Sequence, residues 1–189
     1  MQISIIGTGN MGTAIAKNFK AAGNEVTTIG HGQVAKEFGE LVVFAVPFEA
    51  EAELADQYKH LLAGKIVVDI SNPLNFTTWD ELEVPSNSSA AALLQKELPA
   101  AKVLKAFNTT FAGTLTAGKV GTTPTTVLVA GDDEEAKQTF MKALDGSPLR
   151  VKDAGLLKRA RELEAMGFLQ MTLANRKQIT WMGGFGVNA

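Results

Sequence analysis

Cysteine is absent from this chain of 189 residues, and histidine is scarce, since only His31 and His60 occur. The lack of cysteine excludes disulfides, thiolate catalysis, and zinc or iron–sulfur sites with cysteine ligands. Two histidines are also too few for a histidine-rich metal centre. We therefore expect that the protein binds no metal.

An excess of positive charge and a long apolar run are also missing. The chain has 18 basic and 20 acidic residues, a net charge of -2, so no bulk positive field favours nucleic acid or an anionic membrane. The longest strongly apolar run, Leu41–Phe48, falls far short of the ~20 residues that span a bilayer. Met1 leads directly into an apolar segment without the features of a targeting signal. We expect a cytoplasmic protein that binds neither nucleic acid nor a membrane.

The length and composition of the chain fit one globular domain. Domains hold about 100–200 residues, and 46% of the residues here are hydrophobic, which is enough for a sizeable core. Apolar runs alternate with helical patterns, which predicts an α/β fold with a doubly wound parallel sheet covered by helices on both faces. We expect a single dinucleotide-binding domain over 1–189, in which 150–189 form a C-terminal helix and tail that complete the acceptor cavity or a dimer interface.

The expected elements follow from the apolar periodicity. The predicted strands are Gln2–Ile6, Glu25–Ile29, Leu41–Val46, Lys65–Ile70, Lys102–Phe107 and Thr125–Ala130. The predicted helices are Asn10–Ala22, Glu49–Leu62, Ser88–Leu98, a segment opened by Gly131–Glu135 that runs to Leu144, and Ala154–Arg176. At most one or two helical turns, over Val34–Phe38, fit between the second and third strands, because only about eleven residues connect them. Ser71–Asn87 is predicted to be a polar loop and Asn108–Thr123 to be irregular.

The strongest motif is Gly7-Thr8-Gly9-Asn10-Met11-Gly12, a GxGxxG that follows the first strand and opens an amphipathic helix. In that context the motif indicates dinucleotide binding. The first glycine permits the tight turn, the second lets the backbone approach a pyrophosphate, and the third allows the helix to pack closely on the strand. The helix N-terminus offers N–H groups and a positive dipole to the phosphates. Thr8 and Asn10 either line the phosphate site or cap the helix.

The end of the second strand has no acidic residue. An Asp or Glu there binds the ribose 2′-hydroxyl of NAD, whereas this chain reads Thr27-Thr28-Ile29-Gly30-His31-Gly32-Gln33. A carboxylate would repel a 2′-phosphate, so its absence favours NADP, with NAD less favoured. The backbone N–H groups of Gly30–Gln33 could form an anion nest, and His31 is either a phosphate ligand or a solvent-exposed loop residue.

A set of further segments, in order along nearly the whole chain, resembles the deazaflavin-dependent NADP reductases (NADP oxidoreductases of the coenzyme F420-dependent type) and their bacterial NADP-binding relatives. Besides the glycine motif, the segments are Ala45-Val46-Pro47-Phe48, Asp69-Ile70-Ser71-Asn72-Pro73-Leu74, Lys105-Ala106-Phe107-Asn108-Thr109, Val129-Ala130-Gly131-Asp132-Asp133, Asp153-Ala154-Gly155 and Met182-Gly183-Gly184-Phe185-Gly186. The resemblance implies a Rossmann fold, NADP(H), and hydride transfer to a flavin-like or deazaflavin ring.

The resemblance also implies residue roles. Gly7 to Gly12 would hold the pyrophosphate, and Gly30-His31 stands where the family has a Ser-Arg pair on the 2′-phosphate. Ala45-Val46-Pro47 and Ser71-Asn72-Pro73 would run along the cofactor toward the nicotinamide. Ala106-Phe107-Asn108 would border the nicotinamide and the acceptor cavity. Each of these segments comes at the end of a predicted strand. Ligands of parallel sheets bind at the carboxyl ends of the strands, so the positions are consistent with a ligand site.

Some of these residues have purely structural interpretations as well. Pro73 makes a turn that holds Asn72 extended. Lys105 is either a ligand cation or a strand-end lysine, and Asp69 is either catalytic or an acceptor for loop backbone. Arg161 and Glu164 are expected to be a pair on the helix surface.

The last predicted helix carries more apolar surface than one face can hold. Leu156, Ala160, Leu163, Met166, Leu169 and Leu173 form one stripe, and Ala165, Phe168 and Met171 lie outside it. A helix of this kind must be covered on more than one side, either by the tail or by a second subunit. We expect a homodimer through this helix.

Hydride transfer between two rings needs alignment and exclusion of water more than acid–base chemistry. The chain shows no obvious catalytic acid or base, so no catalytic side chain is predicted. The leading hypothesis is therefore an NADP(H)-dependent oxidoreductase that acts on a small-molecule ring acceptor or donor. One alternative is a non-catalytic NADP-binding redox sensor or regulatory module. A lesser alternative is an imine or hydroxyacid reductase, which needs a larger C-terminal substrate domain than this chain offers.

Overall fold

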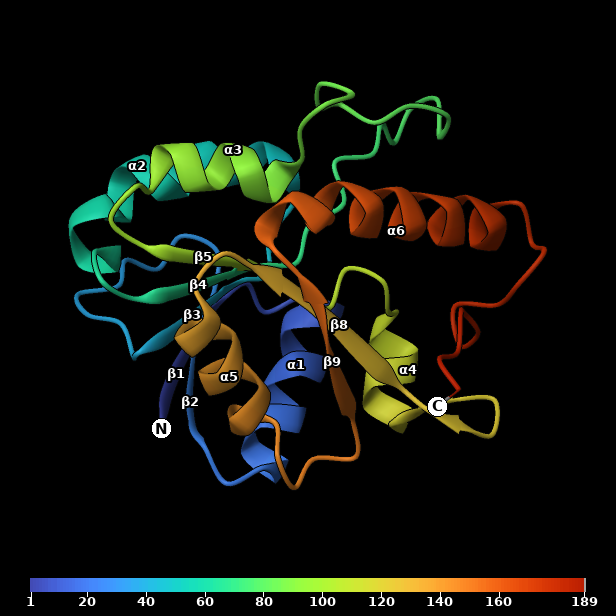
Figure 1. Cartoon of the computed structure of the whole chain (residues 1–189), viewed down its shortest axis with the longest axis horizontal. Helices are drawn as coiled ribbons and strands as arrows, with labels where there is room; N and C mark the ends of the chain where they lie inside the picture. The colour runs from blue at the N-terminus through green and yellow to red at the C-terminus, as the bar shows by residue number, and fades with distance from the viewer. Residues whose placement is uncertain (189) are drawn as a thin grey trace.

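The protein is built around one seven-stranded sheet (Figure 1). The structure is a computed structural model, and it describes residues 1–188. Ala189, the last residue of the predicted domain, lies outside the described residues. In spatial order the strands are β2 (Glu25–Ile29), β1 (Gln2–Ile6), β3 (Leu41–Phe44), β4 (Ile66–Asp69), β5 (Lys102–Lys105), β8 (Thr126–Gly131) and β9 (Arg150–Gly155). The strand order reverses at β1, because β2 and β3 pair with its two opposite edges. A crevice at such a reversal is the usual ligand site of this sheet type.

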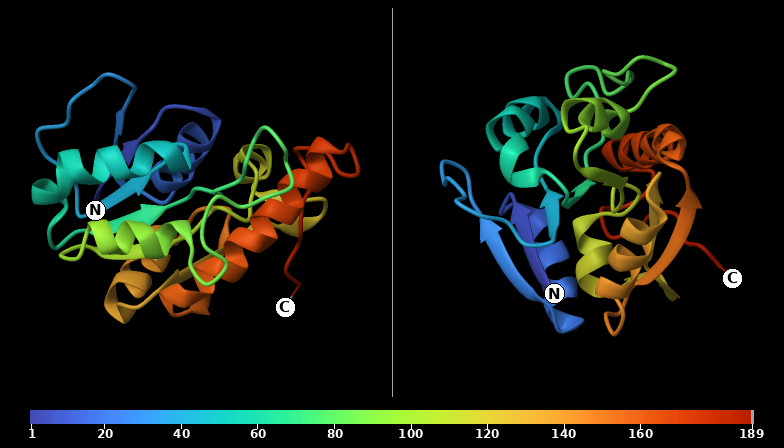
Figure 2. Two further views of the ribbon diagram at one scale, coloured as in Figure 1. Left: turned by 90° about the horizontal axis from the view of Figure 1, so that it is seen from above. Right: turned by 60° about the vertical axis from the view of Figure 1, so that its left-hand side comes forward.

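Helices cover both faces of the sheet, as the α/β pattern predicts. The helices are α1 (Asn10–Ala21), α2 (Glu51–Leu62), α3 (Ala90–Glu97), α4 (Ala112–Ala117), α5 (Glu134–Ala143) and α6 (Ala160–Asn175), with short 3₁₀ turns η1 (Phe48–Ala50) and η2 (Leu157–Arg159). Figures 1 and 2 show α2, α3 and α6 on one face of the sheet and α1, α4 and α5 on the other. Within the described part of the chain, no helix has the length and apolar composition needed to cross a membrane.

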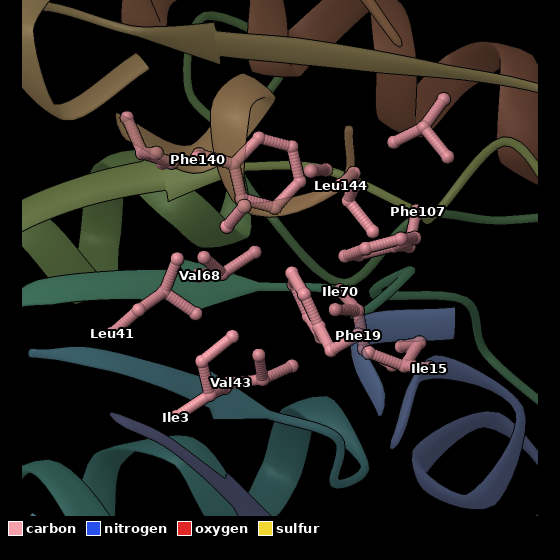
Figure 3. Packing of buried hydrophobic residues seen from close by; sticks show 14 of the residues in the cluster. Ile3, Ile15, Phe19, Leu41, Val43, Val68, Ile70, Phe107, Phe140 and Leu144 are labelled. Atoms are coloured by element: carbon pink, nitrogen blue, oxygen red, sulfur yellow. The ribbon is translucent and has the colours of Figure 1, made fainter. Parts of the chain in front are cut away.

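The core lies in two layers, one on each side of the sheet. On the side of α1 and α5, the rings of Phe19, Phe107 and Phe140 pack edge to face, with centroids 5.5–6.3 Å apart (Figure 3). On the side of α2 and α3, apolar residues of the strands pack against the two helices. Every residue of β3 and β4 is buried, which is the pattern of central strands covered on both faces.

The sheet is mostly parallel, but β8 runs antiparallel to β5, a reversal that the expectation of a parallel sheet did not include. The segment between these strands forms α4 and the hairpin of β6 (Lys119–Val120) and β7 (Thr123–Pro124). It makes no crossover to the opposite end of the sheet. The chain therefore enters β8 from the end at which it left β5, and β9 then pairs parallel to β8.

Three local predictions differ from the structure. The segment Val34–Phe38 forms no helix; Phe38 is instead buried against Tyr58, with ring centroids 5.1 Å apart, so the short connection is held by side-chain packing. The segment Asn108–Thr123, predicted to be irregular, contains α4 and the β6–β7 hairpin. The last helix begins later than predicted, because Arg150–Gly155 extends the sheet as β9.

Candidate functional site

The glycine motif forms the turn between β1 and α1. Gly7 has a φ of 112°, a conformation that side chains disfavour, and a Cβ added there would lie 2.1 Å from the carbonyl oxygen of Ala45. A Cβ on Gly12 would lie equally close to the carbonyl oxygen of Gly7. The first and third glycines are therefore explained by packing within the protein, as the motif predicts.

Gly9 has no such explanation within the chain. It is the N-cap of α1, with φ -69° and ψ -172°, a backbone conformation open to any residue. A Cβ added at Gly9 would meet no atom within 4 Å. No side chain of residues 1–188 caps this helix, and no acidic residue lies in its first turn. The turn thus offers helix N–H groups beside open space, which suits an anionic group such as a phosphate.

A cavity of about 930 Å³ opens at this turn, a volume near the upper end of the range for small-molecule sites. The predicted site residues that line it are Gly9, Asn10, Met11, Ala45, Val46, Pro47, Ser71, Asn72 and Asn108. They follow β1, β3, β4 and β5, so the structure brings the ends of four parallel strands to one cavity. No Lys, Arg, Asp or Glu is among the described residues that line it.

Other predicted site residues lie elsewhere. Thr8 borders a second, smaller hollow of about 470 Å³, together with Thr13, Ala16, Lys17, Lys20 and Thr28. Gly30 and His31 form a turn outside the main cavity, and the Gly30 N–H, predicted to be part of an anion nest, donates to the side-chain oxygen of Gln33 at 2.7 Å. Pro73 is also absent from the lining. Lys17 and Lys20 were not predicted as site residues, although they lie one turn apart on the helix that the motif opens.

Ala106 and Phe107 correct an expectation. Both are fully buried, and the ring of Phe107 packs against Phe19 in the core, so neither side chain faces the cavity. Phe107 nevertheless has a φ of 63°, a conformation that costs a non-glycine residue about 1–3 kcal/mol. This turn directs the chain from β5 into the cavity wall at Asn108.

The side chains of Asn72 and Asn108 bond to each other. Asn108 Nδ2 donates to Asn72 Oδ1 at 2.9 Å and to the carbonyl oxygen of Leu163 on α6 at 2.9 Å, and Asn72 Nδ2 donates to the Asn108 carbonyl at 2.9 Å. Gly167 allows this approach, because a Cβ there would lie 2.4 Å from Asn72 Oδ1. The two asparagines therefore fasten α6 to the strand ends and shape the cavity wall.

The far wall of the cavity comes partly from α6 and the tail, within the segment 150–189 that was predicted to complete the acceptor cavity or a dimer interface, and partly from residues that were not predicted to border the site. These residues are Phe48, Phe76, Thr110–Gly113 and the later residues Thr116, Ala117, Met171, Trp181 and Met182. The chain after α6 turns back toward α4 (Figure 1), where the ring of Trp181 lies 4.8 Å from that of Phe111. Gln170 holds this tail, since its Oε1 accepts from Phe185 N at 2.9 Å. The Gly-rich tail was the only sequence signal for this wall.

A buried charge cluster lies beneath the cavity, formed by Glu51, Asp69, Lys105 and Glu164. Lys105 is fully buried, and its Nζ lies 2.8 Å from Asp69 Oδ2 and 2.9 Å from Glu164 Oε1. Glu164 also accepts from the N–H of Ala90 at 2.9 Å, at the N-terminus of α3. The expected surface pair of Arg161 and Glu164 is therefore wrong: Glu164 faces inward because a buried lysine and a helix N-terminus both require a carboxylate.

The lysine remains charged in this cluster. Burial alone lowers the pKa of Lys105, but the carboxyls of Asp69, Glu164 and Glu51 outweigh burial and raise that pKa above its ordinary value. Burial raises the pKa of Glu164, and Lys105 opposes that shift. Lys105 also donates to the carbonyl oxygen of Ser71 at 2.6 Å, and the Ser71 N–H donates to Asp69 Oδ1 at 2.7 Å. The cluster thus fixes the backbone of one cavity residue.

Comparisons with known proteins give a consistent result. Residues 2–38 match the family model described as NADP oxidoreductase coenzyme F420-dependent. The chain is 34% identical over 155 residues to the F420-dependent NADP reductase of Methanocaldococcus jannaschii, an alignment that covers 78% of this chain and 68% of that protein. It is also 40% identical over 130 residues to the metalloreductase STEAP3 of Rattus norvegicus, but spans only 24% of that longer protein.

Solved structures show the same fold. A crystal structure of a "putative f420 dependent nadp-reductase" from Arthrobacter sp. FB24 is 27% identical, and the two chains cover each other completely with a TM-score of 0.81. An imine reductase from Streptomyces aurantiacus is 17% identical with a TM-score of 0.64, and this chain covers 61% of it. A similarity at 17% identity shows only that the two proteins share a fold.

Proposed function

The chain belongs to the family of F420-dependent NADP reductases and is an NADP-dependent oxidoreductase, and from that premise we propose that its second substrate is a flavin-like or deazaflavin ring. In this proposal the cavity beside the glycine turn holds the nicotinamide and the ring together. The hydride passes between them in a site from which water is excluded.

The observation that carries this proposal is the open space at Gly9. The fold itself tolerates a side chain there, whereas the neighbouring Gly7 and Gly12 are required by packing. Gly9 lies at the N-terminus of α1, which no side chain of the described residues caps, and it lines the cavity. Because Gly9 has no side chain, a pyrophosphate can approach the backbone closely at this position. The ends of β3, β4 and β5 then lie along the rest of the dinucleotide.

The proposed acceptor side of the cavity is aromatic and uncharged. Phe76, Phe111 and Trp181 line it together with the flexible side chains of Met171 and Met182. Aromatic faces stack on a flat ring, and methionine adapts to the shape of its neighbour. When bound, the reduced nicotinamide supplies the hydride; the residues of this chain bind and orient the two rings.

We also propose that NADP is preferred over NAD. The support is the lack of a carboxylate at the end of β2, where Ile29 is followed by Gly30 and His31. Lys17 and Lys20 add positive charge to the hollow beside Thr8. Equilibrium binding of NADP⁺ and NAD⁺ to the purified protein measures this preference.

The direct test of the function is NADPH oxidation in the presence of a flavin or a deazaflavin, followed by the loss of NADPH absorbance. Turnover with a ring acceptor is the expected result. Tight NADPH binding without turnover by any ring acceptor would reject the proposed hydride transfer and would favour a redox sensor or regulatory module.

Replacement of Trp181 by alanine is expected to weaken use of the acceptor more than binding of NADPH. The Trp181 ring is half exposed and lies on Phe111 at the cavity wall. Loss of one aromatic stacking contact of ~1.5 kcal/mol corresponds to a roughly 10-fold rise in the acceptor KM. Steady-state kinetics with varied acceptor, together with NADPH titration, separate the two effects.

The matched control is Phe185→Ala, which removes a partly exposed aromatic residue from the same tail. Phe185 is outside the cavity lining, so its side chain should not affect the acceptor KM. Equal acceptor KM values for wild type and Trp181→Ala would place the acceptor elsewhere.

We further propose that the protein is a homodimer through α6. The buried side of this helix is centred on Gly167, and the predicted apolar stripe is only partly covered, because Leu169 on α6 and Leu156, which precedes η2, are about half exposed. Large exposed apolar side chains that gather at one surface are typical of an interface. Sedimentation at micromolar concentration should show a dimer, and a single monomeric species would contradict this proposal.

A further inference from the structure

Glu51 is a buried carboxyl that takes no part in binding or aligning the two rings, because it is not among the residues that line the cavity. It is the first residue of α2, and only 3% of its surface is exposed. Its Oε1 atom has no hydrogen-bond partner among the described residues. A buried carboxylate without a partner is costly, whereas the protonated acid is neutral and can donate a hydrogen bond.

The surroundings of Glu51 favour the protonated form. The charged groups that face it are Asp69 on β4 and Lys105 on β5, and Glu164 on α6 pairs with that lysine. One lysine therefore serves three carboxyls. Burial and the negative charge of Asp69 raise the pKa of Glu51 well above its ordinary value of 4.5, although Lys105 and the Ser71 hydroxyl oppose that shift.

Ser71 connects this cluster to the cavity. It follows β4, its backbone is bonded to both Asp69 and Lys105, and it also lines the cavity. The Ser71 hydroxyl is buried without a well-formed hydrogen bond to any described residue, yet it is close enough to Glu51 to influence its ionisation. A hydroxyl can accept one proton while it donates another. Ser71 therefore belongs to both the surroundings of Glu51 and the cavity lining.

Ring-to-ring hydride transfer consumes a proton when NADPH is oxidised. NADPH, the oxidised ring and H⁺ give NADP⁺ and the dihydro ring. The C–H bond at the nicotinamide breaks with both electrons, a new bond to hydrogen forms on the acceptor, and the reduced ring takes up one proton. We propose that Glu51 supplies this proton and that Ser71 passes it to the acceptor ring, an inference that rests on the function proposed above.

The solvent replaces the proton that Glu51 gives up. After the transfer, Glu51 is a carboxylate whose charge Lys105 partly offsets, and a proton from water restores the acid before the next turnover. The reverse reaction needs the carboxylate, which takes the proton back from the dihydro ring. NADPH oxidation should therefore slow as pH rises through the pKa of Glu51, whereas NADP⁺ reduction should accelerate over the same range.

Glu51→Gln tests the proposal, because glutamine has the shape of the protonated acid but has no proton to give. General acid catalysis contributes 10²–10⁴-fold, so we expect kcat for NADPH oxidation to fall by roughly 100-fold with NADPH affinity unchanged. The remaining rate should no longer decrease with pH through the pKa of Glu51. Ser71→Ala should lower kcat in the same way without removing the carboxyl.

A second readout does not depend on activity. Because the pKa of Glu51 is raised in the folded state, the unfolded chain releases this proton at lower pH than the folded chain does. The stabilising contribution of the acid is complete below about pH 4.5 and is lost as pH rises through the folded pKa. The difference in Tm, Glu51→Gln minus wild type, should therefore become more positive as pH rises above about 4.5.

Glu53→Gln is the matched control, since it removes the same charge from an exposed position in the first turn of α2. It should leave kcat, its pH dependence and the pH dependence of Tm as in wild type. If wild type turns over but both Glu51→Gln and Ser71→Ala retain its kcat and pH profile, the proton path is wrong and the proposed function stands. If wild type turns over no ring acceptor, the function itself fails, and the proton path fails with it.

Discussion

Replacement of Gly9 by valine is expected to weaken NADPH binding by roughly 5- to 150-fold, the equivalent of the 1–3 kcal/mol that overpacking costs. The added side chain would occupy the space at the N-terminus of α1 where we place the pyrophosphate. Because the protein has no atom within 4 Å of a Cβ at this position, the free energy of unfolding should fall only by about 1 kcal/mol, the cost of a poorer N-cap. NADPH titration and chemical denaturation measure the two quantities.

Gly12→Val is the comparison that separates ligand binding from folding. Its Cβ would lie 2.1 Å from the Gly7 carbonyl oxygen, so this variant should lose stability because the turn and the helix must move apart. Gly9→Val should instead lose affinity while it stays folded. Unchanged NADPH affinity in a folded Gly9→Val would show that the phosphates bind elsewhere.

Lys105→Met should strongly destabilise the protein, with a loss of about 3–5 kcal/mol in the free energy of unfolding at neutral pH. Methionine fills a similar volume but leaves the carboxyls of Asp69, Glu164 and Glu51 buried together without a cation. Burial raises the pKa values of Glu51 and Glu164, so these two carboxyls lose their charge as pH falls and the difference from wild type should shrink. Urea denaturation at several pH values measures the effect.

The control for this variant is Lys102→Met on the same strand. Lys102 pairs with Asp133 at 3.1 Å, but its side chain is 36% exposed, and exposed pairs contribute only about 0–1 kcal/mol. If both variants lost a similar amount of free energy of unfolding, burial would not be what makes the charge cluster important for stability.

The fold was largely predictable because its signals are local. Apolar runs such as Leu41–Phe44 and Ile66–Asp69 are fully buried strands, and the apolar stripe of α1 indicates a helix packed on one face. The local rules failed where contacts distant in sequence decide the structure. Phe38 is held by Tyr58 rather than by a helix, and α4 has only six residues and packs on α1.

The candidate site was only half predictable for the same reason. The residues at the strand ends were named in advance because motifs follow strands, and nine of them line the cavity. For the opposite wall, the sequence predicted only that the C-terminal helix and tail border the cavity. It did not predict the individual residues, because Phe111 and Trp181 are distant in the sequence and meet only when the tail turns back. Lys105 was predicted to be either a ligand cation or a strand-end lysine, and Glu164 part of a surface pair, since no sequence pattern shows that three elements bring their charges into one buried cluster.

The sequence by itself determined the α/β alternation, the glycine turn and the family, because each is written in residues that are neighbours along the chain or recur at a fixed period. The tertiary structure alone decided the antiparallel entry of β8, the aromatic wall, and the burial of Glu51 beside Asp69 and Lys105. These features depend on which distant segments share the same space, and the ionisation of a carboxyl depends on the charges and the solvent that this space contains.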